Sequence, residues 1–282
     1  MPAKKTSRPD PQSLDLPPGG ADAHAHLDLF ERRADLSKIL DRAAACGVSH
    51  IGQVFLGPEA YAVGQAAYAD RPGVFFILGI HPNEAMQCTG QSLAAMRRAF
   101  AHDGRLRALG EIGLDFYRRD CPPLVQEEAF RLQLDLARER DLPVVIHSRS
   151  AAPRTLAVLE AEGFAGRPLL WHCFGGEDAV PLLDRFLANG WRVSIPGPVT
   201  YPANHDLRAA VARTPHDRLL IETDCPYLAP LPWRGTTNEP AFAAFTARTV
   251  AACLKLDVPA LWRLCGANTR RFFGLDAAGG AA

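Results

Sequence analysis

Eight short apolar runs alternate with longer segments of helical spacing along almost the whole chain, and this alternation limits the fold more than any other feature. The clearest helix is predicted over 126–140, where Phe130, Leu134 and Ala137 recur on one face, and a second is predicted over 241–254. The apolar runs begin near Ala21, Ile51, Val74, Arg107, Pro143, Pro168, Arg192 and Arg218. Strands that alternate with helices in this way predict an α/β protein with a parallel sheet.

Eight strand–helix units in 282 residues suit a single (β/α)8 TIM barrel, and an open doubly wound sheet is the alternative. We favour the barrel because polar residues suited to metal binding end the first, fourth, fifth, sixth and eighth strands. Only a closed barrel brings the first and last of these together. No repeat or low-complexity linker interrupts the chain, so we expect one domain over residues 21–275. Residues 1–20 are expected to be a disordered tail, and residues 276–282 a frayed one.

Composition narrows the class of protein. Lys+Arg and Asp+Glu are both 31, so the chain lacks the basic surplus expected of a protein that covers nucleic acid. A nuclease that grips only a strand end can still be neutral, because bound metals supply positive charge. The 7 cysteines include no CxxC pair, which indicates a reduced, cytoplasmic protein. No apolar stretch approaches the roughly 20 residues needed to span a membrane, and no secretory signal is evident.

Six histidines and carboxylates at the far ends of predicted strands are candidate metal ligands. They are His24, His26, Glu111, His147, His172 and Asp224. Imidazoles and carboxylates gathered at one mouth of a barrel can hold two divalent ions with a water between them, which hydrolyses phosphoesters or amides. Each residue alone also has an ordinary structural interpretation, but six such residues at one barrel face are unexpected by chance.

The carboxylates have more specific expected roles. Two metals in a barrel are bridged by a carboxylate or by a carbamylated lysine, and none of the four lysines of this chain ends a strand. Glu111 is therefore the best candidate for the bridge. The structural alternative is a salt bridge between Glu111 and Arg118. Asp224 can bind a metal and accept a proton from bound water. Asp22 is expected to share a face with the HxH pair and to orient a histidine. Cys173 and Cys225 follow candidate ligands directly and should point away from them.

Other residues in the same loops are candidates for binding substrate. His81 ends the third strand, and arginines that can grip an anion follow three of the ligand-bearing strands. These arginines are Arg118, Arg149 and Arg234. Aromatic side chains in these loops can stack on bases or simply cap the barrel; they are Phe116, Tyr117, Phe174, Tyr227 and Trp233.

Taken in order, several motifs resemble the TatD-like family of metal-dependent hydrolases over about residues 22–273. They are DAHAHLD, GIHPNEA, GEIGLDFYR, PVVIHSRSA, LLWHCFGG, DRLLIETDCPYLAP, RGTTNEPAF and ANTRRFF. The resemblance implies a TIM barrel with two divalent metals. One would be held by His24, His26, Glu111 and Asp224, and the other by Glu111, His147 and His172. The chain departs from the family pattern at Asn83, Gly175, Arg119 and Pro196, which bears on substrate choice more than on catalysis.

These observations together favour a deoxyribonuclease that trims the 3′ end of single-stranded DNA with a water activated by two metals. Zinc, manganese and magnesium are all candidate ions, and four imidazoles favour the first two. Hydrolysis of a small amide, lactone or ester is the alternative, and a catalytically silent binding protein is a third hypothesis. The expected partner is single-stranded DNA or another hydrolysable substrate. Neither a membrane nor an obligate protein partner is expected.

Overall fold

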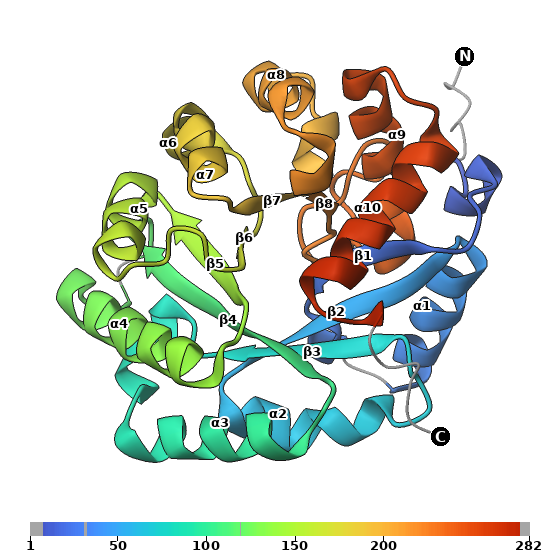
Figure 1. Ribbon diagram of the computed structural model, residues 1–282. Coiled ribbons are helices and arrows are strands. Elements are labelled where there is room, and N and C mark those ends of the chain that lie inside the picture. The colour runs from blue at the N-terminus through green and yellow to red at the C-terminus, as the bar shows by residue number, and fades with distance from the viewer. Residues whose placement is uncertain (1–7, 31–32, 119, 277–282) are drawn as a thin grey trace.

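The computed structural model describes residues 8–30, 33–118 and 120–276, and over these residues eight strands form one parallel sheet in chain order. The strands are β1 (Gly20–Ala25), β2 (Val48–Leu56), β3 (Val74–Gly79), β4 (Leu106–Asp115), β5 (Val144–Arg149), β6 (Leu169–Trp171), β7 (Arg192–Ile195) and β8 (Leu219–Ile221). They form a ring that surrounds a common axis (Figure 1). The predicted TIM barrel is therefore confirmed, and the open sheet is excluded.

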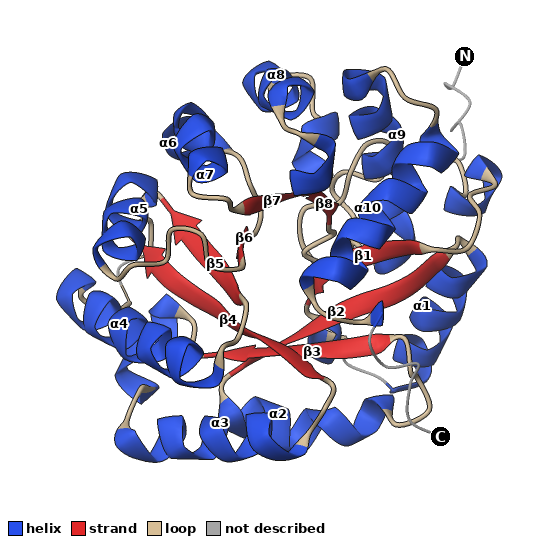
Figure 2. Cartoon of the chain, in the orientation of Figure 1, coloured by secondary structure: helices blue, strands red, loops and turns tan. Residues whose placement is uncertain are grey.

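Helices cover the outside of this ring (Figure 2). They are α1 (Arg33–Ala45), α2 (Pro58–Gly64), α3 (Gly90–His102), α4 (Pro123–Arg140), α5 (Ala152–Ala161), α6 (Gly176–Ala179), α7 (Leu183–Ala188), α8 (His205–Arg213), α9 (Ala243–Leu254) and α10 (Val258–Phe272). The helix predicted over 126–140 lies within α4, and the one predicted over 241–254 is α9 preceded by a 3-10 turn, η8 (Pro240–Phe242).

Backbone hydrogen bonds between the ends of the first and last strands close the barrel. The amide of Asp224 donates to the carbonyl of His24 at 2.9 Å, and the amide of His26 donates to the carbonyl of Cys225 at 2.8 Å. Three candidate ligands, His24, His26 and Asp224, therefore take part in the closure through their own backbone. The same segments therefore close the barrel and carry part of the candidate site.

Apolar side chains fill the barrel interior beneath the candidate ligands. One buried cluster takes residues from β1 to β6 and from β8, and the aromatic rings of Phe272 and Phe273 join it from the end of α10 and the residue after it. Val145 and Leu170 belong to this cluster, and they stand two residues before His147 and His172. Since strand side chains alternate between faces, the same inward face carries an apolar layer and then an imidazole layer.

The strand that carries Glu111 is longer than expected. The sequence pattern predicts that this strand ends at Glu111, whereas β4 continues to Asp115. Its pairing with β5 shifts between Leu109 and Ile112, where β4 holds one residue more than its partner. Such a bulge reverses which residues face inward, and it turns Glu111 toward the barrel axis.

The segment before β1 is folded, contrary to the expectation of a disordered tail over residues 1–20. Residues Pro11–Leu14 form a 3-10 turn, η1, capped by the side chain of Asp10. The indole of Trp233 donates to the carbonyl of Pro9, and that of Trp262 donates to the carbonyl of Pro17, each at 3.0 Å. Residues 1–7, the predicted tail beyond 276 and position 119 lie outside the described residues.

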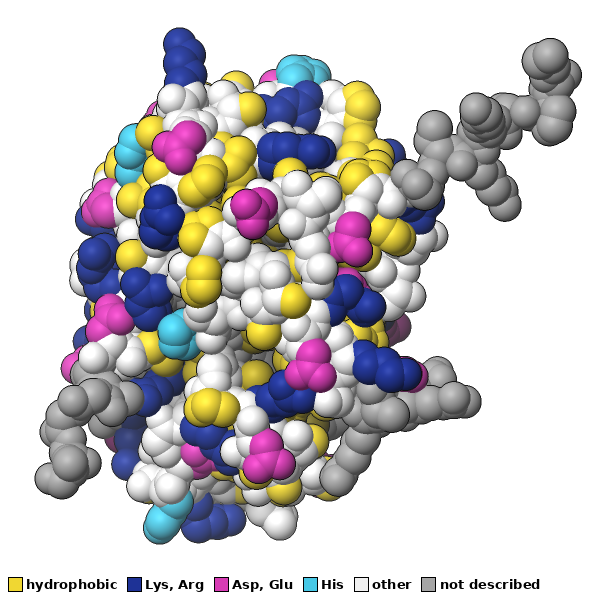
Figure 3. Space-filling model, turned by 90° about the vertical axis from the view of Figure 1, so that its right-hand side faces the viewer, with side chains coloured by type: hydrophobic (Ala, Val, Ile, Leu, Met, Phe, Trp, Pro, Cys, Tyr) yellow, Lys and Arg dark blue, Asp and Glu magenta, His cyan; other side chains and the backbone are white. Residues whose placement is uncertain are grey.

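The described part of the chain contains no helix with both the length and the apolar character to cross a membrane. Basic and acidic side chains are interspersed over the face seen in Figure 3, without a continuous basic surface. This distribution agrees with the balanced formal charge of the sequence.

Candidate metal site at the barrel mouth

All six predicted ligands meet around the carboxylate of Glu111 or beside it. One oxygen, Oε2, lies 3.3 Å from Nε2 of His24 and 3.6 Å from Nε2 of His26. The other, Oε1, contacts Nδ1 of His147 and lies 3.0 Å from Nε2 of His172. Each oxygen of Glu111 therefore faces a different pair of imidazoles, which is the arrangement a bridging carboxylate requires.

Asp224 completes the group formed by the HxH pair. Its Oδ1 lies 3.3 Å from Nε2 of His26 and 3.8 Å from Nε2 of His24. The three side chains bring one potential ligand atom each within 4.8 Å of the others. Asp224 has a φ of +55°, a left-handed conformation that aspartate tolerates better than most residues, so the chain turns here just after β8.

His24 provides a test of whether the site suits a metal. Its side chain is fully buried, yet within the described residues neither ring nitrogen has a hydrogen-bond partner of suitable geometry. Buried polar atoms are nearly always paired, so an orphaned imidazole surrounded by carboxylates and other imidazoles fits a cation ligand. The donor set of nitrogen and carboxylate oxygen atoms suits zinc or manganese.

The charge state of the carboxylates also suits a metal. Burial raises the pKa of Glu111, but His172 and His147 outweigh burial and hold that pKa well below its usual value. Burial likewise raises the pKa of Asp224, and the hydrogen bond from His26 with the nearby histidines brings it below the usual value. Both carboxylates are therefore ionised in the neutral range.

His81 lies in the same cluster but offers a proton rather than a lone pair. Its Nε2 is 3.6 Å from Oε1 of Glu111, while its Nδ1 accepts a hydrogen bond from the amide of Asn83 at 3.1 Å. Burial and the neighbouring His147 lower the pKa of His81 to about 3, so the ring is neutral. A neutral ring that accepts at Nδ1 carries its hydrogen on Nε2, which makes His81 a donor toward the centre of the site.

Comparison with known proteins identifies the family. Residues 21–274 match the family model described as TatD related DNase. The chain belongs to the TatD family of metal-dependent hydrolases. It is 38% identical over 262 residues to an uncharacterized metal-dependent hydrolase TatD of Mycobacterium tuberculosis, a match that covers 90% of this chain and 97% of the relative.

Two further relatives extend the TatD assignment. The chain is 36% identical to a protein of Erwinia billingiae named 3′-5′ ssDNA/RNA exonuclease TatD, with 91% of this chain and 99% of the relative covered. Among solved structures, the TatD homologue YjjV of Escherichia coli K12 superposes with a TM-score of 0.83 at 28% identity, covering 90% of this chain and 98% of the other. The predicted family resemblance is thus confirmed over nearly the full lengths of all three proteins.

Asp115 also belongs to this TatD-family site, although the sequence pattern did not predict it. Its Oδ2 lies 3.3 Å from Nε2 of His147, on the side of the ring opposite Glu111. Its Oδ1 accepts hydrogen bonds from the amides of Tyr117 at 3.0 Å and Arg118 at 2.9 Å. Asp115 therefore links the orientation of one candidate ligand to the loop that carries two candidate substrate-binding residues.

Glu222 is the second missed carboxylate. Its side chain is fully buried and accepts hydrogen bonds from the amide of Cys173 at 2.5 Å and from the hydroxyl of Ser194. Its Oε1 lies 3.5 Å from Nδ1 of His172. It stands two residues after Leu220 of the interior cluster, so strand alternation could have placed it on the inward face.

The prediction that the carboxylate of Asp22 orients a histidine side chain was wrong. Its carboxylate accepts hydrogen bonds from the amide and hydroxyl of Thr223 and from the backbone amide of His24, and none from an imidazole within the described residues. The register between β1 and β2 shifts between Asp22 and Ala25, which breaks the simple alternation on which the expectation relied. Asp22 thus ties β1 to the end of β8.

The predicted substrate-binding arginines are exposed at the loops around the mouth. The guanidinium carbon of Arg149 lies 3.8 Å from the ring centroid of Tyr117, and that of Arg234 lies 4.2 Å from the ring centroid of Tyr201. Arg118 contributes only its backbone amide to the hydrogen bond with Asp115. Within the described residues, no hydrogen bond or ion pair joins these guanidinium groups to the six candidate ligands, and no metal-binding group includes a cysteine.

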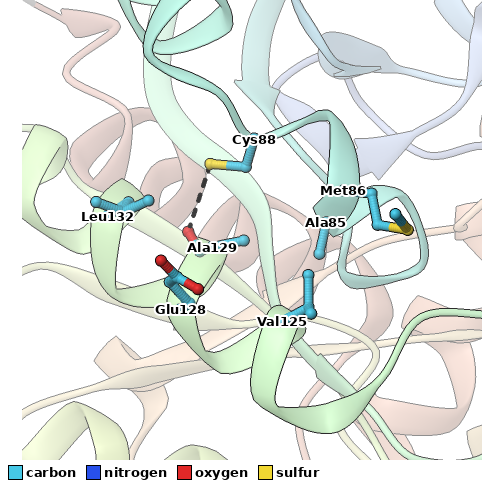
Figure 4. A pocket seen from close by; sticks show the side chains of 7 residues that line it. All are labelled: Ala85, Met86, Cys88, Val125, Glu128, Ala129 and Leu132. Atoms are coloured by element: carbon cyan, nitrogen blue, oxygen red, sulfur yellow. Dashed lines mark hydrogen bonds between the residues drawn. The ribbon is translucent and has the colours of Figure 1, made fainter.

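A separate hollow of about 250 Å³ lies between α4 and the 3-10 helix η4 (Pro82–Gln87), outside the barrel. It is lined by Ala85, Met86, Cys88, Val125, Glu128, Ala129 and Leu132 (Figure 4). The thiol of Cys88 faces the carbonyl of Ala129 across it at 3.8 Å. The six candidate ligands are not part of its lining, so the hollow is distinct from the metal site.

Proposed function

We propose that this TatD-family chain is a nuclease that removes nucleotides from the 3′ end of single-stranded DNA. The observation that carries the proposal is the convergence of four imidazoles and two ionised carboxylates at one mouth of the barrel. The Erwinia billingiae relative, named as a 3′-5′ ssDNA/RNA exonuclease, supports the substrate class.

Two divalent ions fit the donor set. His24, His26 and Asp224 would hold one, His147 and His172 would hold the other, and Glu111 would contribute an oxygen to each. Bound ions of this kind lower the pKa of water and neutralise charge that develops on a phosphate.

The side chains of the chain supply the rest of the reaction. Asp224, held ionised by His26, accepts the proton of the water that attacks phosphorus. His81 donates its Nε2 hydrogen to an oxygen of the phosphate, which stabilises the added negative charge in the transition state. The bond from phosphorus to the 3′ oxygen of the preceding nucleotide then breaks, that oxygen takes up the proton held by Asp224, and the terminal nucleotide leaves as its 5′-monophosphate. Arg149 at the end of β5 binds the neighbouring phosphate.

The test is hydrolysis of 5′-labelled single-stranded DNA with added Mg²⁺, Mn²⁺ or Zn²⁺. We expect wild-type protein to produce a ladder that shortens from the 3′ end. Glu111→Ala should be inactive, and Glu128→Ala, an exposed carboxylate on α4, should behave as wild type. Metal-stripped protein that cleaves at the full rate in a chelator would contradict the mechanism.

Absence of cleavage by protein with bound metal would redirect the assignment to the small amides, lactones or esters that the same chemistry can hydrolyse. The dependence on salt separates the two, because a nuclease weakens as salt screens its phosphate contacts. A binding protein without catalysis would be indicated if Asp224→Ala left biological activity unchanged.

A further inference from the structure

We propose that two arginine–tyrosine stacks at the barrel mouth are nucleotide-binding subsites that hold a single strand of nucleic acid over the metal site. One stack is Arg149 on Tyr117, and the other is Arg234 on Tyr201. The inference rests on the proposed nuclease function and specifies its substrate as a polynucleotide chain that spans both stacks.

The first stack is built on the ends of β4 and β5. Asp115 pairs with Arg149 in the sheet register, and the amide of Phe116 donates to the carbonyl of Arg149 at 2.9 Å. The hydrogen bond from the amide of Tyr117 to Asp115 fixes the tyrosine over the guanidinium. Tyr117 is 63% exposed, so its ring is accessible to a ligand.

The second stack is built on the segments that follow β7 and β8. Tyr201 ends the 3-10 turn η6 (Gly197–Thr200), and its hydroxyl donates to the carbonyl of Ala229 at 2.8 Å. The amide of Leu231 donates to the hydroxyl of Thr200 at 2.8 Å, which ties the loop that carries Arg234 to the same turn. Both stacks are thus held by hydrogen bonds from the barrel framework.

The ring of strands places the two stacks on different sides of the mouth. Going one way around the barrel, β6 separates them, and going the other way, β1 to β3 do (Figure 1). His172 directly follows β6, and the HxH pair lies at the end of β1. A strand that reaches from one stack to the other therefore passes over the candidate ligands.

Both arginines lack the carboxylate partner that several other arginines of the described chain have. Arg97 pairs with Glu139, and Arg213 pairs with Asp184. In the described part of the chain, neither Arg149 nor Arg234 makes an ion pair with a carboxylate. A guanidinium with one face on a tyrosine keeps its N–H edge free for a phosphate and its other face free for a base. Two such groups on different sides of the mouth match two separated nucleotides of one strand, whereas a small ester would contact at most one.

Binding of fluorescent oligodeoxythymidylates with phosphorothioate linkages, which resist hydrolysis, tests the inference in the metal-loaded protein. We expect Arg149→Ala and Arg234→Ala each to weaken binding of an octanucleotide roughly tenfold, the loss typical of one stacked base. Each should also reduce the slope of log affinity against log salt by about one. A dinucleotide should respond to only one of the two substitutions, because it cannot reach both stacks.

Arg98→Ala is the matched control, since Arg98 is an exposed arginine on α3, away from the mouth. Arg149→Lys and Arg234→Lys keep the charge but not the planar face, so they should restore the salt slope and only part of the affinity. Unchanged melting temperatures will show that the variants are folded. The inference is overturned if both alanine variants bind the octanucleotide as tightly as Arg98→Ala. If both alanine variants bind normally and the protein still cleaves DNA, the inference fails but the nuclease function holds. The two outcomes can be told apart because the binding assay uses an oligonucleotide that is not hydrolysed.

Discussion

At the scale of single residues, Asp115 controls more of the site than its place in the sequence suggests. It contacts the face of His147 remote from Glu111 and also holds the amides of two loop residues. A carboxylate that fixes the outer nitrogen of a ligating histidine selects its tautomer, so the inner nitrogen keeps the lone pair for the metal.

Asp115→Asn should therefore weaken metal binding by about tenfold to a hundredfold. The asparagine can still accept the hydrogen bonds from the loop amides through its oxygen, but its amide group meets His147 as a second donor. Metal titration by calorimetry measures the effect. Asp120→Asn, in the same loop and exposed, is the control. Equal metal affinities for the two variants would show that Asp115 does not orient His147.

A second prediction at this scale concerns the replacement of Gly113. Its φ is +143°, and a Cβ added there would lie 1.9 Å from the carbonyl oxygen of His147. Gly113→Ala must therefore displace the strand that carries a candidate ligand, and we expect loss of bound metal together with a marked fall in melting temperature. Gly163→Ala, at a φ of +71° with open space around the Cβ, isolates the cost of the backbone conformation, about 1 kcal/mol. The prediction would be refuted if Gly113→Ala bound as much metal as Gly163→Ala.

The sequence was sufficient to predict the positions of the six candidate ligands, because each follows a recognisable apolar strand. It was insufficient for Asp115 because the bulge in β4 changes both the length of that strand and the direction of its side chains. A bulge depends on pairing with β5, which is a tertiary property. The arginine–tyrosine stacks were not predicted for a similar reason, since the two members of each stack come from different segments of the chain.

At the scale of elements, the segment before β1 acts as a strap on the loop after β8. Residues 8–14 contact this loop through Trp233, whose indole donates to Pro9 and whose ring stacks on Phe242 at 4.8 Å. The side chain of Arg8 also reaches the carbonyl of Arg234 at 3.5 Å. The strap thus supports a loop that carries one of the proposed subsites.

Trp233→Phe keeps a ring over Phe242 but loses the hydrogen bond, so it should lower the free energy of unfolding by about 1 kcal/mol. In protein that lacks residues 1–14, the same substitution should have almost no effect, because its partner is gone. Denaturant unfolding of the four proteins gives the coupling energy directly. A substitution that costs as much in the truncated chain as in the full chain would show that the strap and the loop are independent.

The turn between α3 and β4 gives a prediction about pH. Burial raises the pKa of Asp103, but hydrogen bonds from Arg105 and Tyr61 outweigh burial and leave that pKa below its usual value. A carboxyl group with a lowered pKa stabilises the fold above its unfolded pKa of about 4, and this stability disappears as pH falls through the folded value. Asp103→Asn should therefore cost roughly 1 kcal/mol at neutral pH and almost nothing once the pH has fallen below the lowered pKa of Asp103. Urea unfolding at several pH values would disprove this if the difference between the proteins stayed constant.

At the scale of the whole molecule, metal binding and folding should be coupled through the closure of the barrel. Metal at a hundredfold excess over its dissociation constant should stabilise the protein by about 3 kcal/mol. Glu111→Gln should abolish most of this gain, since both groups of candidate ligands contact Glu111, and Glu128→Gln should retain it. Thermal unfolding with and without chelator measures the difference, and a melting temperature insensitive to added metal would contradict the coupling.

The overall architecture was predictable from the sequence because it depends on periodicity and on the positions of the strand ends. The choice of a barrel over an open sheet was predictable from chemistry, since ligands from β1 and β8 had to meet. The folded segment 8–19 was not predictable, because its Pro-rich and Gly-rich composition resembles that of a linker. Its backbone is held by the indoles of Trp233 and Trp262, which are more than 200 residues away in the sequence, so no local pattern could have indicated these contacts.

The closure between β1 and β8 also bears on the order in which the protein becomes functional during synthesis. His24 emerges from the ribosome two hundred residues before Asp224, and their backbones hydrogen-bond to each other. A nascent or prematurely terminated chain that stops short of β8 has neither a closed barrel nor a complete set of acidic groups. Hydrolytic capacity therefore requires synthesis to proceed past Asp224, because the two ends of the barrel must both be present before the candidate ligands can meet.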